Sequence, residues 1–377
     1  MMTAESRKGS EEAVKEPAER ALALAMAQLG QVSPLPAVGA VVFRNGGAVA
    51  ASATAPPSGL HAERRALAAA GDAARGADLY VTLEPCDHHG ATPPCTEAII
   101  SAGIARVFVA VRDPNPVAGG GVERLRAAGI DVHMGMGGPA AAEIYQGFFK
   151  WTEHKRPYVT AKWAMSKDGK IAGPGGKTLQ ISGAESRLRV HEMRRRADAL
   201  LVGSGTVLAD DPLLTCRLGG YAGKQPLRVV LDRRLRIPPT AKMLQTDVPG
   251  NTLIVTAPGA PEDRVAALRD AGAEVVVLEK VPEALLDELG RRGALNLLVE
   301  GGGEVLRAFF AAGLVDRVEA FVAPFAVGDG VAMPVTGTEP TEFRRATGSG
   351  AVSFQDSGED VQITAIVNTY GPAEQIV

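Results

Sequence analysis

Apolar and polar positions alternate in two successive blocks along the chain, and each block predicts strands interleaved with helices. In the first block, the apolar stripe of "ERALALAMAQLG" predicts a helix that ends near Gly30. Further segments are predicted as strands at 37–43, 77–83 and 106–111 and as helices at 61–71 and 95–103. Strands that alternate with helices predict a layered α/β domain.

The second block starts after "GFFKWTEHKRPY" (147–158), which is a candidate domain boundary. Its expected strands are 158–164, 197–203, 227–232, 251–257, 274–278, 296–300 and 317–324, and its expected helices are 184–196, 262–271, 282–292 and 304–312. The last segment, "EDVQITAIVNTYG" (359–371), alternates as a half-buried edge strand would. We therefore expect a flexible leader over 1–17 and two α/β domains, over 18–150 and 157–371.

Composition narrows the functional classes. A chain of 377 residues with 46% hydrophobic and 22% charged residues is typical of a globular protein with two domains. The net charge of -3 gives no basic excess for nucleic acid, and no apolar run approaches the ~18 residues that would span a membrane. The polar start lacks the apolar core of a secretory signal, and three cysteines do not form a disulfide framework. We expect a cytoplasmic protein with neither nucleic acid nor membrane as a partner.

Three residues of the first block form a candidate metal site. His61, Cys86 and Cys95 offer one imidazole and two thiolates, the ligand types that zinc prefers. Three protein ligands leave the fourth tetrahedral position open for water, as in catalytic zinc sites. The alternative is two buried cysteines with an incidental histidine. His88 and His89, inside the loop, are alternative ligands that we rank lower because that loop is better placed to face a substrate.

Glu63 is the candidate proton carrier of this site. It lies two residues after His61, which places its carboxylate beside the metal, where it could take a proton from water and deliver it to a leaving nitrogen. We expect His61 to open one helix. Cys86, after a strand and the "EP" pair, should start another, where the helix dipole favours a thiolate.

This arrangement of His-x-Glu and Pro-Cys is similar to that of the zinc nucleobase deaminases. The resemblance implies a three-layer fold like that of cytidine deaminase. The eight residues between the cysteines in "TLEPCDHHGATPPCTEAII", followed by "VRDPNPVAGGGVERLRAAGIDV", resemble the family of bifunctional riboflavin-biosynthesis deaminase/reductases. That resemblance implies a diaminopyrimidinone substrate that carries a ribosylamino 5-phosphate.

The chain departs from that family's pattern near the first site. In "SPLPAVGAVV", Leu35 replaces an asparagine that would contact the substrate. In "HHGATPPC", Ala91 replaces the usual arginine, and the segment before His61 lacks its usual aromatic residue and histidine. The zinc ligands and Glu63 are retained, whereas several substrate contacts are not.

The second block carries two sequence features of a ligand site. In "LVEGGGEVLRAFF", a predicted strand runs through three glycines into a helix, and free amides at a helix start attract phosphate oxygens. In "TVLADDP", the adjacent carboxylates Asp210 and Asp211 are expected at the end of a strand. An ordinary turn explains the paired carboxylates equally well, and a lone glycine triplet is more often a simple turn than a phosphate site. The glycines do not form the G-x-G-x-x-G pattern of dinucleotide folds.

Together with "AKWAMSKDGKIA", these segments are similar to the reductase half of the same family, over about 158–370. The resemblance implies a fold like that of dihydrofolate reductase and hydride transfer from NADPH that opens a ribosyl ring to a ribityl chain. The residues that it places at NADPH are Ala164, Gln180, Thr206, Asp210, Arg233, and the loop 302–308 with Gly302 and Gly303. The residues that it places at the substrate are Thr178, Arg194, Leu214, Arg217 and Glu300.

The chemistry of these residues agrees with the resemblance. Arg194 and Arg217 could bind a phosphate monoester bidentately, and Arg233 and Arg234 could meet the 2′-phosphate of the cofactor. Lys162 and Asp168 are further candidates for moving protons or positioning groups. For the arginines at the end of the helix 184–196, the alternative is a charged helix end that suits the dipole.

The leading hypothesis is a bifunctional enzyme, a zinc deaminase and an NADPH-dependent reductase, that acts as a homo-oligomer, either dimer or tetramer. A second hypothesis retains only the reductase, with zinc stabilising the first domain. A third is a module that binds a pyrimidine or flavin precursor without turnover, although a purely structural zinc would not need Glu63.

Overall fold

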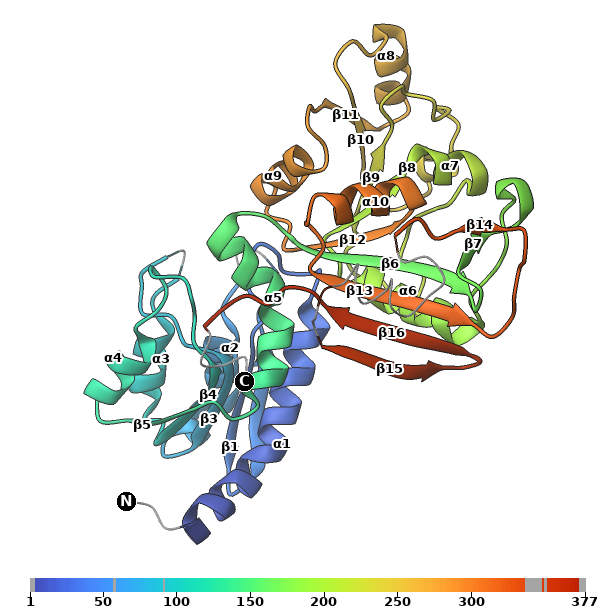
Figure 1. Ribbon diagram of the computed structural model, residues 1–377. Coiled ribbons are helices and arrows are strands. Elements are labelled where there is room, and N and C mark those ends of the chain that lie inside the picture. The colour runs from blue at the N-terminus through green and yellow to red at the C-terminus, as the bar shows by residue number, and fades with distance from the viewer. Residues whose placement is uncertain (1–3, 57–58, 91, 336–347, 349–350, 373–377) are drawn as a thin grey trace. The chain divides into compact units, whose positions relative to one another are not determined.

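The computed structural model describes residues 4–56, 59–90, 92–335, 348 and 351–372, with the backbone alone for 4–11 (Figure 1). The chain divides into two compact units, residues 1–154 with 370–377, and residues 155–369. The division falls in the interval between the two expected domains, and Tyr370 belongs to the first unit.

The first unit is built on a five-stranded sheet in the order β2-β1-β3-β4-β5. The strands are β1 (Gly39–Arg44), β2 (Gly47–Ala53), β3 (Asp78–Leu83), β4 (Arg106–Val111) and β5 (Asp131–Met134). The pairs β1–β2 and β1–β3 are antiparallel, whereas β3–β4 and β4–β5 are parallel. Every residue of β3 is buried, because helices cover both faces of the sheet.

The described residues of this unit also form five α-helices: α1 (Ala4–Gln28), α2 (Ala62–Ala70), α3 (Cys95–Ala102), α4 (Gly121–Ala127) and α5 (Gly138–His154). Helices α1 and α5 pack together on one face, and α2, α3 and α4 pack on the other (Figure 1). The expected three-layer α/β fold is therefore confirmed. Helix α1 begins at Ala4, so most of the segment that we expected to be a flexible leader is helical, and Val14 within it is buried.

The second unit contains a nine-stranded sheet in the order β11-β10-β9-β8-β12-β6-β13-β16-β15. The strands are β6 (Tyr158–Ser166), β8 (Ala199–Gly203), β9 (Leu227–Leu231), β10 (Thr252–Thr256), β11 (Glu274–Val277), β12 (Asn296–Gly301), β13 (Arg317–Ala323), β15 (Val352–Ser357) and β16 (Asp360–Ile366). The pairs from β11 to β13 are parallel, and the last two pairs are antiparallel. A separate small sheet pairs β7 (Lys170–Ala172) with β14 (Val331–Ala332).

Helices cover both faces of this sheet as well. They are α6 (Ala184–Arg196), α7 (Ser204–Asp210), α8 (Glu262–Asp270), α9 (Glu283–Arg291) and α10 (Gly303–Ala311). One core packs α9 and α10 against the sheet through residues such as Leu289 and Phe309, and a second core packs α7 and α8 on the other face through Val207 and Leu268. The parallel strands therefore read as continuous apolar runs.

Three local expectations were wrong. The segment 359–371 contains β16, which lies between β13 and β15 and is not an edge strand. Asp210 ends helix α7 and Asp211 is its C-cap with a φ of 41°, so these carboxylates follow a helix and not a strand. The third concerns Cys86, which lies in the connection after β3, whereas the next helix begins at Cys95.

Candidate functional site

The three predicted metal ligands converge in the first unit. His61 precedes the first turn of α2, Cys86 follows β3, and Cys95 is the first residue of α3. Their ligand atoms all lie within 4.8 Å of one another. The Nδ1 atom of His61 lies 3.5 Å from the Sγ atom of Cys86 and 3.3 Å from that of Cys95. A tetrahedral zinc would hold an imidazole nitrogen and a thiolate sulfur roughly 3.6 Å apart, so the three residues fit this ion.

Cys86 has the environment of a thiolate. Hydrogen bonds from Cys95 and His61 lower the pKa of Cys86 to about 4, the contribution of Cys95 being the larger. The backbone amide of Cys95, at the start of α3, donates to the Cys86 sulfur at 3.4 Å. We expected a helix to begin at Cys86 itself. Instead, the sulfur of Cys86 lies at the N-terminus of α3, a helix that starts nine residues later in the sequence.

Glu63 lies beside the three ligands, as predicted. Its side chain is buried in the first turn of α2, and this burial raises its pKa to about 7. Glu63 also interacts with the thiol of Cys95. A carboxyl group with this pKa exchanges a proton readily near neutral pH.

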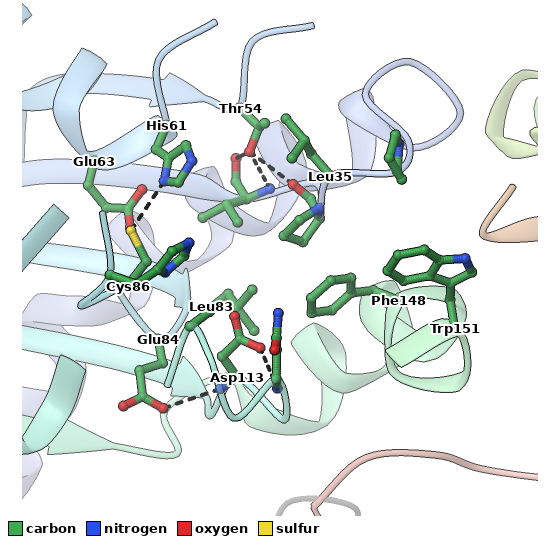
Figure 2. Close-up of a pocket in the computed structure, with 16 residues that line it drawn as sticks. Leu35, Thr54, His61, Glu63, Leu83, Glu84, Cys86, Asp113, Phe148 and Trp151 are labelled. Atoms are coloured by element: carbon green, nitrogen blue, oxygen red, sulfur yellow. Dashed lines mark hydrogen bonds between the residues drawn. The ribbon is translucent and has the colours of Figure 1, made fainter. Parts of the chain in front are cut away.

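A cavity of about 280 Å³ opens next to this group. Figure 2 shows His61, Glu63 and Cys86 on one side of it and Leu35, Phe148 and Trp151 on the opposite side. The full described lining is Pro34, Leu35, Pro36, Val38, Thr54, His61, Glu63, Leu83, Glu84, Cys86, His88, Asp113, Asn115, Ala118, Phe148 and Trp151. Sequence reasoning missed the two aromatic residues because nothing in their local pattern distinguishes them from core positions of α5.

A buried carboxylate holds the floor of the cavity in place. Glu84 accepts backbone N–H groups from Asp113 at 3.2 Å and from Val122 at 3.0 Å, which ties the segment after β4 and the start of α4 to the "EPC" stretch. Gly121 permits this approach, because a Cβ atom there would lie 1.8 Å from the carbonyl oxygen of Pro85. Burial raises the pKa of Asp113, which lines the cavity, to about 6.

The remaining predictions for this site have different outcomes. Leu35 lines the cavity, as expected for a residue in contact with substrate. His88 also lines it, and its buried Nδ1 atom has no hydrogen-bond partner among the described residues. His89 is exposed, with its Nε2 atom 3.6 Å from Glu97. Ala91 lies outside the described residues.

In the second unit, two predicted substrate contacts bind each other. Arg194, in the last turn of α6, donates from Nε and Nη2 to the two carboxylate oxygens of Glu300 on β12, each at 2.6 Å. It also donates to the carbonyl of Thr215 at 3.0 Å. Arg217 lies near this pair, and its Nη1 atom donates to the hydroxyl of Thr215 at 3.1 Å.

Two further residues join this cluster. The backbone N–H of Arg217 donates to Nδ1 of His191 at 3.2 Å, and burial together with Arg194 and Arg217 lowers the pKa of His191 to about 4. His191 could not be predicted from the sequence, since a single histidine inside a polar helix gives no signal. Lys162, on β6, interacts electrostatically with Glu300, and burial lowers its pKa.

The residues predicted at the cofactor lie mainly where the parallel strands end, the edge at which open α/β sheets bind ligands. Asp210, predicted at the cofactor, accepts a hydrogen bond at 2.5 Å from the hydroxyl of Thr178, which was predicted at the substrate. Gly302 has a φ of 70°, and a Cβ atom there would lie 3.5 Å from the hydroxyl oxygen of Thr206. The structure therefore brings predicted residues together in two places, Thr178 with Asp210 and Gly302 with Thr206. Gly303 begins α10, Ala164 is half-buried on β6, and Gln180 and Arg233 are exposed on loops.

Leu214 and Asp168 have local structural roles. Leu214 is buried with a φ of 53°. The carboxylate of Asp168 accepts hydrogen bonds from Ser166 at 2.5 Å and from the backbone amides of Val327 and Gly328 at 3.0 and 2.8 Å. These bonds, led by that from Ser166, hold its pKa well below the usual range. Asp168 thus fixes a turn beside β6.

Each of the two units matches a known protein family. The family described as "Cytidine and deoxycytidylate deaminase zinc-binding region" matches residues 16–111, and that described as "RibD C-terminal domain" matches residues 157–363. The riboflavin biosynthesis protein RibD of Aquifex aeolicus is 42% identical over 324 residues, which cover 85% of this chain and 90% of the relative. That of Bacillus amyloliquefaciens is 41% identical over 355 residues, covering 92% and 94%.

Solved structures of similar proteins point to the same family as the sequence relatives. A diaminohydroxyphosphoribosylaminopyrimidine deaminase/5-amino-6-(5-phosphoribosylamino)uracil reductase from Thermotoga maritima superposes with a TM-score of 0.82 at 34% identity, over 95% of this chain and 99% of the other. RibD of Acinetobacter baumannii superposes with a TM-score of 0.80 at 32% identity, over 94% and 99%. The chain therefore belongs to the RibD family of riboflavin biosynthesis proteins, with a zinc-binding deaminase domain in its first unit and the family's reductase domain in its second.

Proposed function

We propose that the first unit deaminates 2,5-diamino-6-(5-phosphoribosylamino)pyrimidin-4(3H)-one and that the second then reduces the ribosyl group of the product to ribityl. The observation that carries the proposal is the convergence of His61, Cys86 and Cys95 on one point, with buried Glu63 beside them at the end of a cavity. Three ligands with an adjacent carboxyl group serve hydrolysis, whereas a structural zinc is normally closed by a fourth protein ligand.

His61, Cys86 and Cys95 would hold the zinc. When bound, zinc supplies a Lewis acid that makes water a nucleophile near neutral pH. Glu63 accepts a proton from the water as its oxygen adds to the amidine carbon of the ring. Glu63 first gives that proton to the neighbouring ring nitrogen. It then takes the remaining proton from the added hydroxyl group and passes it to the amino nitrogen as the carbon–nitrogen bond breaks, so that ammonia leaves and a carbonyl remains. The apolar wall around Leu83 and Phe148 limits the access of other water.

In the second unit, we propose that Ala164, Gln180, Thr206, Asp210, Arg233, Gly302 and Gly303 line NADPH, which supplies the hydride when bound. The positive φ values of Gly301 and Gly302 support this placement, because they leave backbone without side chains at the start of α10. Thr178, Arg194, Leu214, Arg217 and Glu300 would meet the substrate. Arg217 would bind its 5-phosphate, while Arg194 and Glu300 hold each other in place.

One observation favours a second candidate function, in which only the reductase is active on this substrate. Leu35 stands in the cavity wall where a polar contact to the pyrimidine would be expected. In that case the first unit would retain its zinc and Glu63 but act on another compound. Release of ammonia separates the two candidates.

We also propose that the enzyme acts in the cytoplasm as a homodimer or homotetramer. Among the described residues, no helix combines the length and apolar character that crossing a bilayer requires. Cell fractionation would test the location, and sedimentation equilibrium would test the assembly.

The proposed function is tested by analysing the metal content of the purified protein and assaying ammonia release and NADPH oxidation on the same substrate. We expect one zinc per chain, ammonia release without NADPH, and NADPH oxidation that depends on prior deamination. If zinc-loaded protein oxidises NADPH with the deaminated compound but releases no ammonia from its precursor, only the reductase is active on this substrate.

A further inference from the structure

The cavity of the first unit has a reactive end and an apolar end. His61, Glu63 and Cys86 lie on one side, and Leu35, Phe148 and Trp151 lie on the other (Figure 2). The ring carbon that loses its amino group must lie at the metal. Any substituent that extends across the cavity from the reacting carbon therefore meets an apolar wall.

The described cavity wall offers no lysine or arginine to a phosphate. Its ionisable groups include three carboxyl groups, those of Glu63, Glu84 and Asp113. Zinc with two thiolates and an imidazole would add no net charge. Three residues between Leu35 and Trp151 lie outside the described part of the chain, Pro57, Ser58 and Ala91, and none of them carries an ionisable side chain. A phosphate dianion is disfavoured in such surroundings.

The cations next to the lining residues are already engaged. Arg112 donates to Glu123 at 2.9 Å and lies 3.9 Å from Glu84. Arg64 donates to the carbonyl oxygens of Pro93 and Pro94 at 3.4 and 3.2 Å. The buried Lys150, which precedes Trp151 in the sequence, has its ammonium 5.3 Å from the centre of the Tyr370 ring.

Two backbone amides at helix N-termini near the cavity are engaged as well. At the start of α3, the amide of Cys95 donates to the sulfur of Cys86 at 3.4 Å. At the start of α4, the amide of Val122 donates to Glu84 at 3.0 Å. These amides are the groups that would otherwise bind phosphate oxygens at a helix start.

We infer that the deaminase cavity recognises the aminopyrimidine ring and not the 5-phosphate of its substrate, so the first unit also accepts the dephosphorylated ribosylaminopyrimidine. The inference rests on the proposed function and narrows it. The second unit differs, because Arg217 there is an exposed guanidinium without a carboxylate partner among the described residues.

The test compares ammonia release by the zinc-loaded, full-length protein from the phosphorylated aminopyrimidine and from the same compound after treatment with a phosphatase, without NADPH. We expect values of kcat/KM within about threefold of each other, since a recognised phosphate would contribute on the order of 10- to 100-fold. A preference of about tenfold or more for the phosphorylated form would overturn the inference.

Ionic strength gives a second readout. If no cation of the protein binds the phosphate, kcat/KM for deamination of the phosphorylated form should not fall as salt rises, because there is no attraction to screen. A steep fall that is absent for the dephosphorylated form would contradict the inference.

The outcomes also separate this inference from the proposed function. Ammonia from neither compound, with zinc bound, would overturn both. Ammonia from the phosphorylated compound alone would leave the deaminase function standing and overturn the inference.

Discussion

Arg194 and Glu300 form a bidentate ion pair in the second unit, with both hydrogen bonds at 2.6 Å and side chains that are only 12% and 6% exposed. Both residues had been predicted as substrate contacts, and the pair leaves the charge of each largely compensated. Arg217 is therefore the better candidate to bind the phosphate. The ion pair instead holds α6 against β12.

Removal of one partner from this pair should destabilise the second unit. We expect Arg194→Ala to cost about 3–5 kcal/mol, because it leaves the buried carboxylate of Glu300 without its bidentate partner. The triple variant Arg194→Met, Glu300→Leu and Lys162→Met, which also removes the buried ammonium near Glu300, should recover most of that loss. Urea unfolding measures both, in a background with Trp151→Phe that leaves Trp163 as the single tryptophan reporter. Equal losses in the single and triple variants would contradict this account.

Loss of one thiolate should remove the metal. Cys95→Ser should lower the zinc content of the purified protein and abolish ammonia release, because serine is a poor zinc ligand. NADPH oxidation with the deaminated compound should persist. Cys216→Ser is the matched control, since Cys216 is also buried but lies in the second unit. Retention of zinc in Cys95→Ser would remove that residue from the ligand set.

Glu63→Gln should separate metal binding from proton transfer. The amide has nearly the same shape but accepts no proton from water, so we expect kcat for deamination to fall by roughly 10²- to 10⁴-fold. Metal analysis should show unchanged zinc. Wild-type rates in this variant would exclude Glu63 as the proton carrier.

Arg217→Ala should weaken the reductase step. If Arg217 makes a charge-assisted contact to the 5-phosphate, its loss should cost about 1.5–3 kcal/mol, which corresponds to roughly a 10- to 150-fold higher KM for the deaminated substrate. Arg187→Ala is the control, because Arg187 is an exposed residue of α6 that donates to the carbonyl of Ser182. Unchanged kinetics in Arg217→Ala would remove this residue from the site.

The pH dependence of stability should contain a contribution from His191. Folding lowers the pKa of this imidazole from about 6.5 to about 4, so between these values the unfolded chain binds more protons than the native protein. Stability therefore falls as pH decreases from about 6.5 to 4, when the protonated imidazole can no longer accept the N–H of Arg217.

We expect His191→Gln to lose less stability than wild type across that interval, as measured by urea unfolding at pH 6.5 and 4.5. NMR titration gives a direct check, because the imidazole signal that His191→Gln removes should titrate near pH 4. A midpoint near 6.5 would show that the imidazole is not held neutral by its surroundings.

Much of the fold could be predicted from the periodicity of apolar residues and from short motifs. The strand β4 and the helix α6 agree with their predicted ranges, 106–111 and 184–196. Five buried apolar residues follow Arg106 in β4, and α6 is rich in residues with high helix propensity. The strands β2 and β15 escaped prediction. Small and polar residues dominate both, and β15 has five of its six residues at least partly exposed, so neither shows a clear alternation.

For the functional site, the sequence by itself determined the donor types and their local frame, since His61 and Glu63 are two residues apart on one helix start. Only the tertiary structure decided that the start of α3 reaches Cys86, that Leu35 and Trp151 close one cavity, and that Arg194 is bound by Glu300. These relationships join residues that are far apart in the sequence, such as Arg194 and Glu300, which are separated by 106 positions. Their formation depends on how helices pack on the sheets, and a local pattern of polar and apolar residues carries no record of that packing.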